Sequence, residues 1–135
     1  MKFKALSFVF VIAVVALAMA TASYAHHSFG ATYQSNEEIR LEGKLVQFAF
    51  RNPHSFVHIE APDQYGDVQR WAIEWSGTGS LASQGVERTT LRAGDEVIVT
   101  GRPSRTPGEF RVQMLTLARP ADGFEWGRRA GEVID

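Results

Sequence analysis

The chain contains no cysteine among its 135 residues. This absence excludes iron–sulfur clusters, thiolate metal sites and cysteine catalysis, and it means that the fold depends on packing rather than on disulfides. The sequence also lacks the basic stripe that nucleic-acid-binding proteins usually carry, so we expect no nucleic-acid partner.

Three enzyme motifs are missing as well. The sequence has no Gly-x-Ser-x-Gly elbow, no His-Glu-x-x-His helix and no Gly-rich phosphate loop before a helix. An N-terminal-histidine copper oxygenase would need a much larger scaffold around its metal. We therefore expect a protein that is not an enzyme.

The long apolar run at the N-terminus has the pattern of a signal peptide. Lys2 and Lys4 give a positively charged start, residues 5–18 form an apolar core, and small residues continue to Ala25. An uncleaved membrane anchor is the alternative, because the apolar run is long, but the small-residue segment favours cleavage. We predict a signal peptide at residues 1–25 and a periplasmic or secreted protein without a membrane segment after cleavage. The mature chain would carry 12 basic and 15 acidic residues, a net charge of −3.

Alternation of apolar and polar residues predicts five strands between residues 39 and 118. Ile39, Leu41 and Leu45 share one parity, and the apolar positions then change parity at residues 46–50, which predicts a bulge or strong bend near Gly43. Further strands are expected at residues 54–61, 68–75, 96–102 and 110–118. A hairpin turn at residues 63–67 joins the second strand to the third. Between the third and fourth strands, residues 81–84 should form a short helix that Ser80 caps and Gly85 ends.

This order predicts an all-β domain: a small five-stranded barrel of the OB (oligonucleotide/oligosaccharide-binding) type with one short helix between strands three and four. A five-stranded sandwich is the alternative. Residues 26–38 are expected to form an irregular arm that Phe29 and Tyr33 could pin to the domain. Residues 39–118 would form the barrel, and residues 119–135 a C-terminal extension on the surface or partly disordered.

Four segments stand out together. They are residues 25–29 (Ala-His-His-Ser-Phe), 52–54 (Asn-Pro-His), 71–74 (Trp-Ala-Ile-Glu) and 91–101 (LRAGDEVIVTG). In combination they resemble a family of exported bacterial proteins known as domain of unknown function 6152. The resemblance implies an exported barrel and brings no established activity. The chain departs from the family pattern at residues 76–79, Ser-Gly-Thr-Gly, where a Ser-Pro-Asn-like turn is expected.

All four histidines lie in two short stretches: His26 and His27 at the processing junction, and His54 and His58 within residues 52–58. Cleavage after Ala25 would let the new amine and the ring of His26 chelate one metal, with His27 as a further imidazole. Such a nitrogen-rich set favours Cu(II), whereas Zn(II) needs a more tetrahedral one. The Cα atoms of His54 and His58 would lie roughly 13 Å apart along one strand, so at most one of them joins the pair, and we favour His54.

Glu74 is a candidate neighbour of this site, either as a ligand or as an acceptor that holds an imidazole in place. One hairpin register places His54 opposite Glu74 and His58 opposite Arg70. A second register places Trp75 and Trp71 at those positions, and the sequence leaves both open.

Two hypotheses of function follow. The first is an exported barrel that binds a transition metal, copper in particular, through His26, His27 and His54. The second is a binding module for a small ligand, a glycan or a partner protein. In that case His26 and His27 are a polar terminus, His54 stabilises its turn and His58 is a surface or packing residue.

Overall fold

The structure is a computed structural model that describes residues 29–127, in two units that divide after Thr32. In the first unit, residues 29–32 form one helical turn. An irregular arm was predicted there instead of a helical segment. No helix within residues 29–127 is long and apolar enough to span a membrane.

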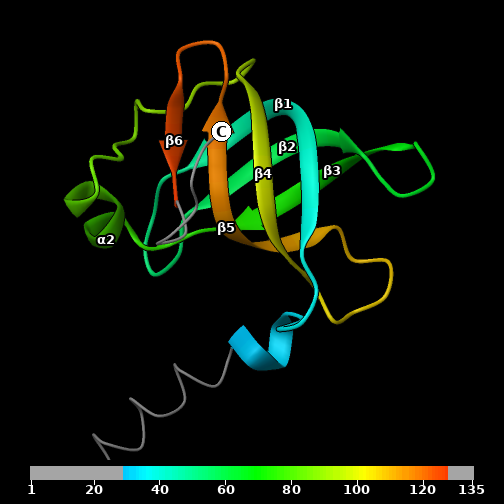
Figure 1. Cartoon of the computed structure of the whole chain (residues 1–135). Coiled ribbons are helices and arrows are strands. Elements are labelled where there is room, and N and C mark those ends of the chain that lie inside the picture. The colour runs from blue at the N-terminus through cyan, green and yellow to red at the C-terminus, as the bar shows by residue number, and fades with distance from the viewer. Residues whose placement is uncertain (1–28, 128–135) are drawn as a thin grey trace, which may run out of the picture. The chain divides into compact units, whose positions relative to one another are not determined.

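The second unit is a closed β-barrel (Figure 1). Its strands form one sheet in the order β3-β2-β1-β4-β5-β6, and a parallel pairing of β3 with β5 closes the barrel. The elements are β1 (Ile39–Ala49), β2 (Phe56–Pro62), β3 (Val68–Glu74), α2 (Thr78–Ser83), β4 (Glu96–Pro103), β5 (Arg111–Arg119) and β6 (Phe124–Trp126). The predicted five-stranded OB-like barrel with a short helix between β3 and β4 is confirmed, and the sandwich alternative is wrong.

Strand β1 is long because it serves both halves of the barrel. Its first residues pair with β4, from Ile39 to Lys44, and the rest pair with β2 up to Ala49. The register with β2 shifts between Leu45 and Gln47, so the predicted change of face occurs two to four residues after Gly43. A Cβ added at Gly43 would lie 2.1 Å from the carbonyl oxygen of Glu60. Glycine is therefore required where the bent strand approaches β2 closely.

The alternating apolar residues fill the barrel as expected. Trp71 and Trp75, with 8% and 3% of their surface exposed, belong to this core. The best-buried aliphatic residues of the strands share this inward face: Leu45, Val57, Ile59, Ile73, Val97, Val99, Val112 and Leu117.

The C-terminal region contains a strand that the sequence did not predict. Strand β6 pairs with the end of β5, with Trp126 opposite Leu117. The ring of Trp126 packs edge-on against Trp75, with ring centroids 4.9 Å apart, and its indole N–H donates to Gln84. Three residues are too few to show a period of two, so only the two aromatics hinted at this packing. Residues 128–135 lie outside the described residues.

The start of α2 is fixed by the loop between β1 and β2. The helix begins at Thr78, and Asn52 Oδ1 accepts hydrogen bonds from the Thr78 N–H (2.9 Å) and hydroxyl (3.0 Å). The predicted cap at Ser80 is therefore wrong, because a side chain from a distant loop performs this role. Gly85, with φ of +79°, follows the helix as expected. The N–H of Ser55 also donates to the carbonyl of Ser76 at 3.1 Å, so three hydrogen bonds, two to Asn52 and one from Ser55, hold the segment that contains His54.

Candidate functional site

Glu74 is a buried carboxylate on the outer side of the barrel. Its neighbours in sequence, Ile73 at the end of β3 and Trp75 directly after it, belong to the core, so the alternation directs Glu74 away from the core. The residue is nevertheless only 6% exposed. A buried charge requires partners of its own, and they define the site.

Three side chains contact the Glu74 carboxylate. Oε2 accepts hydrogen bonds from the hydroxyl of Tyr33 and from Nη2 of Arg111, the latter at 2.6 Å. Oε1 lies 2.6 Å from Nδ1 of His54. Nε of Arg111 also donates to the Tyr33 hydroxyl at 2.8 Å, which closes a ring of contacts. We call Tyr33, His54, Glu74 and Arg111 the Glu74 cluster.

Each member reaches the cluster from a different part of the fold. Tyr33 precedes β1 and is held by a bridge to Ser104, and Arg111 begins β5, beside Ala72 of β3 in the parallel pair. His54 lies just before β2. The β3–β5 pairing that closes the barrel therefore also brings Arg111 to Glu74.

The cluster keeps Glu74 ionised. Burial alone would raise the pKa of its carboxyl, but the hydrogen bonds from Tyr33 and Arg111 outweigh burial and hold this pKa below its ordinary value. The pKa of the Tyr33 hydroxyl is strongly raised, first by burial and then by its hydrogen bond to Glu74. The phenol therefore remains a donor and the carboxylate an acceptor.

The hairpin register differs from both that were considered. Phe56 pairs with Glu74 and His58 with Ala72, so β2 is displaced relative to both alternatives. His54 still reaches Glu74, because residues offset by two positions on neighbouring strands are diagonal neighbours on one face. The predicted contact between His54 and Glu74 is thus present, although the strands pair in a different register.

His58 takes no part in the cluster. Its ring stacks on Phe56, with centroids 6.2 Å apart and planes inclined by 20°. The pKa of His58 is lowered by burial and then by the charges of Arg70 and Arg51. These cations also oppose a metal ion at this ring, so His58 is a poor ligand candidate.

Within residues 29–127, no group of three or more histidines, cysteines or carboxylates is placed to hold a metal ion. His26 and His27, the two other proposed ligands, lie outside the described residues. Of the proposed ligand set, the described part of the chain contributes His54, with Glu74 behind its ring.

The sequence of this chain was compared with those of known protein families. The family DUF6152, a family of unknown function, matches residues 13–111. The chain belongs to this family. The match confirms the resemblance inferred from the sequence, and it includes both histidine segments and the whole Glu74 cluster. No curated protein matches this DUF6152 protein.

Two members of the cluster were not predicted as site residues in this DUF6152 protein. Tyr33 was expected only to pin the arm, and Arg111 carried no expectation. The sequence did indicate that Glu74 needs a cation as a partner, because this carboxylate lies between two core positions. Nothing in the sequence says which arginine supplies it.

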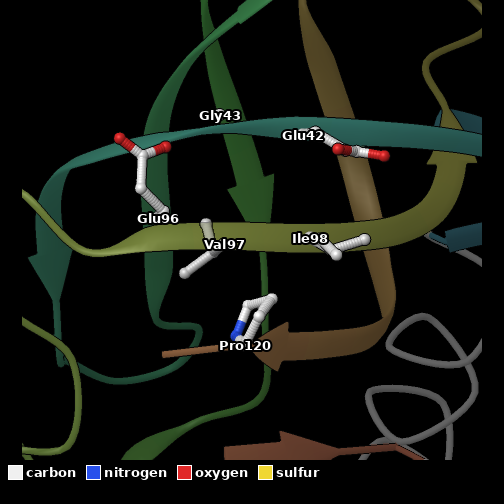
Figure 2. A pocket seen from close by; sticks show the side chains of 6 residues that line it. All are labelled: Glu42, Gly43, Glu96, Val97, Ile98 and Pro120. Carbon is white, nitrogen blue, oxygen red and sulfur yellow. The ribbon is translucent and has the colours of Figure 1, made fainter. Parts of the chain in front are cut away.

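This DUF6152 protein also has a shallow depression away from the cluster, with a volume of about 220 Å³. Figure 2 shows its lining residues: Glu42 and Gly43 on β1, Glu96, Val97 and Ile98 on β4, and Pro120 directly after β5. Glu96 pairs with Lys44 at 3.5 Å. The depression is open and combines two surface carboxylates with apolar side chains, so it does not compete with the Glu74 cluster as a site.

Proposed function

We propose that this protein is an exported, non-catalytic barrel that binds a transition metal ion, Cu(II) in particular, through His26, His27 and His54. The observation that supports it best is the 2.6 Å contact between His54 Nδ1 and Glu74 Oε1. A carboxylate at one imidazole nitrogen fixes the orientation of the ring and makes the other nitrogen a better metal ligand. Nε2 is therefore the atom of His54 that would bind the ion.

In this proposal Glu74 supports the ligand and is not a ligand itself. Both of its oxygens already contact protein groups, Oε1 with His54 and Oε2 with Tyr33 and Arg111. A metal ion at Oε1 would compete with the ring of His54, and a metal ion at Oε2 would compete with the guanidinium of Arg111, which is partly buried. Of the two roles considered for Glu74, these contacts favour the acceptor role.

The length of the arm is compatible with the proposed partners of His54. Tyr33 is bonded to the same carboxylate that contacts His54. His27 precedes Tyr33 by six residues, and six residues of chain span at most about 20 Å. The covalent chain therefore limits how far the N-terminal histidines can lie from the cluster.

Copper binding by the mature protein tests this proposal. The exported protein is purified, its N-terminus is established by intact mass, and Cu(II) is titrated against a competing chelator. We expect one ion per chain and loss of tight binding in His26→Ala. Glu74→Gln should weaken binding by about 10–100-fold, as is typical when the acceptor behind a metal-bound histidine is removed, and His54→Ala by at least as much.

The matched control is His58→Ala, which removes the other histidine of the same segment and should leave copper affinity unchanged. If the mature chain begins at Ser23 or earlier and binds copper no tighter than an unrelated peptide, the metal function is wrong. If His54→Ala matches the wild type while His26→Ala does not, the terminus binds alone and the barrel supplies no ligand.

The second candidate function is a binding module for a small ligand, a glycan or a partner protein, with structural histidines. The closed set of contacts in the Glu74 cluster favours it, because such a cluster fixes His54 whether or not a metal is present. The thermal stability of His54→Ala separates the two functions. If the Tm of His54→Ala lies below that of wild type by the same amount with and without Cu(II), the binding module is favoured. If the difference in Tm is larger with Cu(II), the metal site is favoured.

A further inference from the structure

The outer face of β2 carries a second group of side chains beside the Glu74 cluster. The guanidinium carbons of Arg51 and Arg111 lie 5.3 and 5.5 Å from the centroid of the Phe56 ring, which is half-buried. His58 stacks on the same ring, and Arg70 lowers the pKa of His58 from the neighbouring strand β3. We call Arg51, Phe56, His58 and Arg70 the Phe56 face.

The positive charge of this face is only partly compensated. Arg51 and Arg70 are exposed, and neither forms an ion pair within residues 29–127. On the same face, the carboxylate of Glu74 is already held by Arg111 and His54, and Glu60 is opposite Arg70 in the register. Two guanidinium groups therefore remain available beside two stacked rings.

We propose that the Phe56 face binds an acidic glycan, with Arg51 and Arg70 on its carboxylates and a sugar ring beside Phe56 and His58. Guanidinium groups bind carboxylates through two parallel hydrogen bonds, which suits a uronate group. In OB-type barrels the face of strands two and three is a common site for oligosaccharides. This inference is independent of the metal, because none of the proposed copper ligands belongs to the Phe56 face.

Two other classes of partner fit the face less well. An extended peptide would bind by adding a strand, but β2 is paired on one side with β1 and on the other with β3. A nucleic acid would require a longer basic surface than two arginines, on a chain whose net charge is −1.

A binding experiment with defined oligosaccharides tests the proposal. An oligogalacturonate and a neutral galactose oligomer of the same length are titrated into the mature protein at low salt, with binding followed by calorimetry. We expect binding of the acidic oligomer only. Arg51→Gln and Arg70→Gln should each weaken it about tenfold, and added salt should weaken it further.

The control variant is Arg92→Gln, which removes an exposed arginine from the turn before β4 and should leave binding unchanged. Circular dichroism establishes that all three variants are folded. Three results would overturn the proposal: no binding of the oligogalacturonate, equal binding of the neutral oligomer, or equal loss in Arg92→Gln. Tighter binding of a poly-glutamate peptide than of the oligogalacturonate would likewise show that the partner is not a glycan.

Discussion

Replacing Glu74 by glutamine tests whether the Glu74 cluster stabilises the fold as a charged unit. The substitution keeps the size of the side chain and removes its charge. Arg111 then loses its ion pair, and the contact with His54 loses its anionic acceptor. The side chain of Glu74 is 7% exposed, so little water replaces these partners. We expect Glu74→Gln to be folded and clearly less stable than wild type.

The magnitude follows from burial. Removing one partner of a fully buried ion pair costs about 3–5 kcal/mol. Arg111 is 34% exposed, so water recovers part of its hydration and we expect a loss of about 2–3 kcal/mol. For a domain of this size, that loss corresponds to a decrease in Tm of roughly 10–20 °C.

Urea unfolding followed by tryptophan fluorescence measures this loss. The control is Glu42→Gln, because Glu42 is paired with Arg40 on the surface and is 59% exposed. Exposed pairs contribute about 0–1 kcal/mol, so this variant should remain close to wild type. If Glu74→Gln and Glu42→Gln lose the same stability, the cluster does not act as a buried charged unit and the reasoning fails.

The pH dependence provides a second, independent measurement. The pKa of Glu74 in the fold lies below its ordinary value of 4.5, so between these two values the unfolded chain binds a proton that the folded chain does not. Stability therefore rises with pH in this window, and it is lost as pH falls through the folded pKa. In Glu74→Gln, the free energy of unfolding should fall less steeply as the pH is lowered. Asp63, Asp95 and Asp122 also have lowered pKa values, so part of the loss of stability at low pH should persist.

Three further predictions concern the packing around the site. Gly43→Ala should lower stability by more than about 2 kcal/mol, because its Cβ would collide with the backbone of β2, whereas Gly79→Ala has open space within α2 and should be neutral or slightly stabilising in the same urea assay. Asn52→Ala removes the acceptor of Thr78 at the start of α2 and should cost about 1 kcal/mol, measured by thermal unfolding. The pKa of Tyr33 is raised above its ordinary value of 10.0, so the folded state retains a proton that the unfolded state releases, and wild-type stability should fall as pH rises above this value. Tyr33→Phe should be less stable at neutral pH, and its stability should fall less than that of wild type at high pH. An equal fall in both proteins would contradict the role given to the Tyr33 hydroxyl.

Local patterns in the sequence were sufficient to predict the barrel. Strict alternation of apolar and polar residues identified the inward faces of β2, β3 and β4, and the change in this alternation within β1 predicted its bulge. The bulge lies after Gly43 rather than at it, because the glycine is needed for the close approach to β2 and the extra residue is accommodated further along the strand. Strand β6 was missed because its position depends on the packing of Trp126 against Trp75, a contact between residues distant in sequence.

The site was predictable only in part, for the same reason. His54 and Glu74 were paired in advance because both lie near one hairpin, where the possible registers are few. Tyr33 and Arg111 are 41 and 37 residues from Glu74, and their arrival depends on barrel closure, which periodicity does not describe. The observed register is offset by two residues from the alternative that places His54 opposite Glu74, so both keep the same residues on each face and the alternation could not distinguish them.

The burial of Glu74 is itself an argument for function. An ion pair of this kind is often no more stabilising than well-packed apolar residues of similar volume, because both charges lose their hydration. Stability alone therefore gives little reason to place a carboxylate on the outer side of a barrel and surround it with Tyr33 and Arg111. An apolar cluster could not do what this one does, which is to hold the ring of His54 by one nitrogen with a fixed anionic acceptor. The orientation of His54 is the property that the buried charge adds, and it is the property that a metal ligand requires.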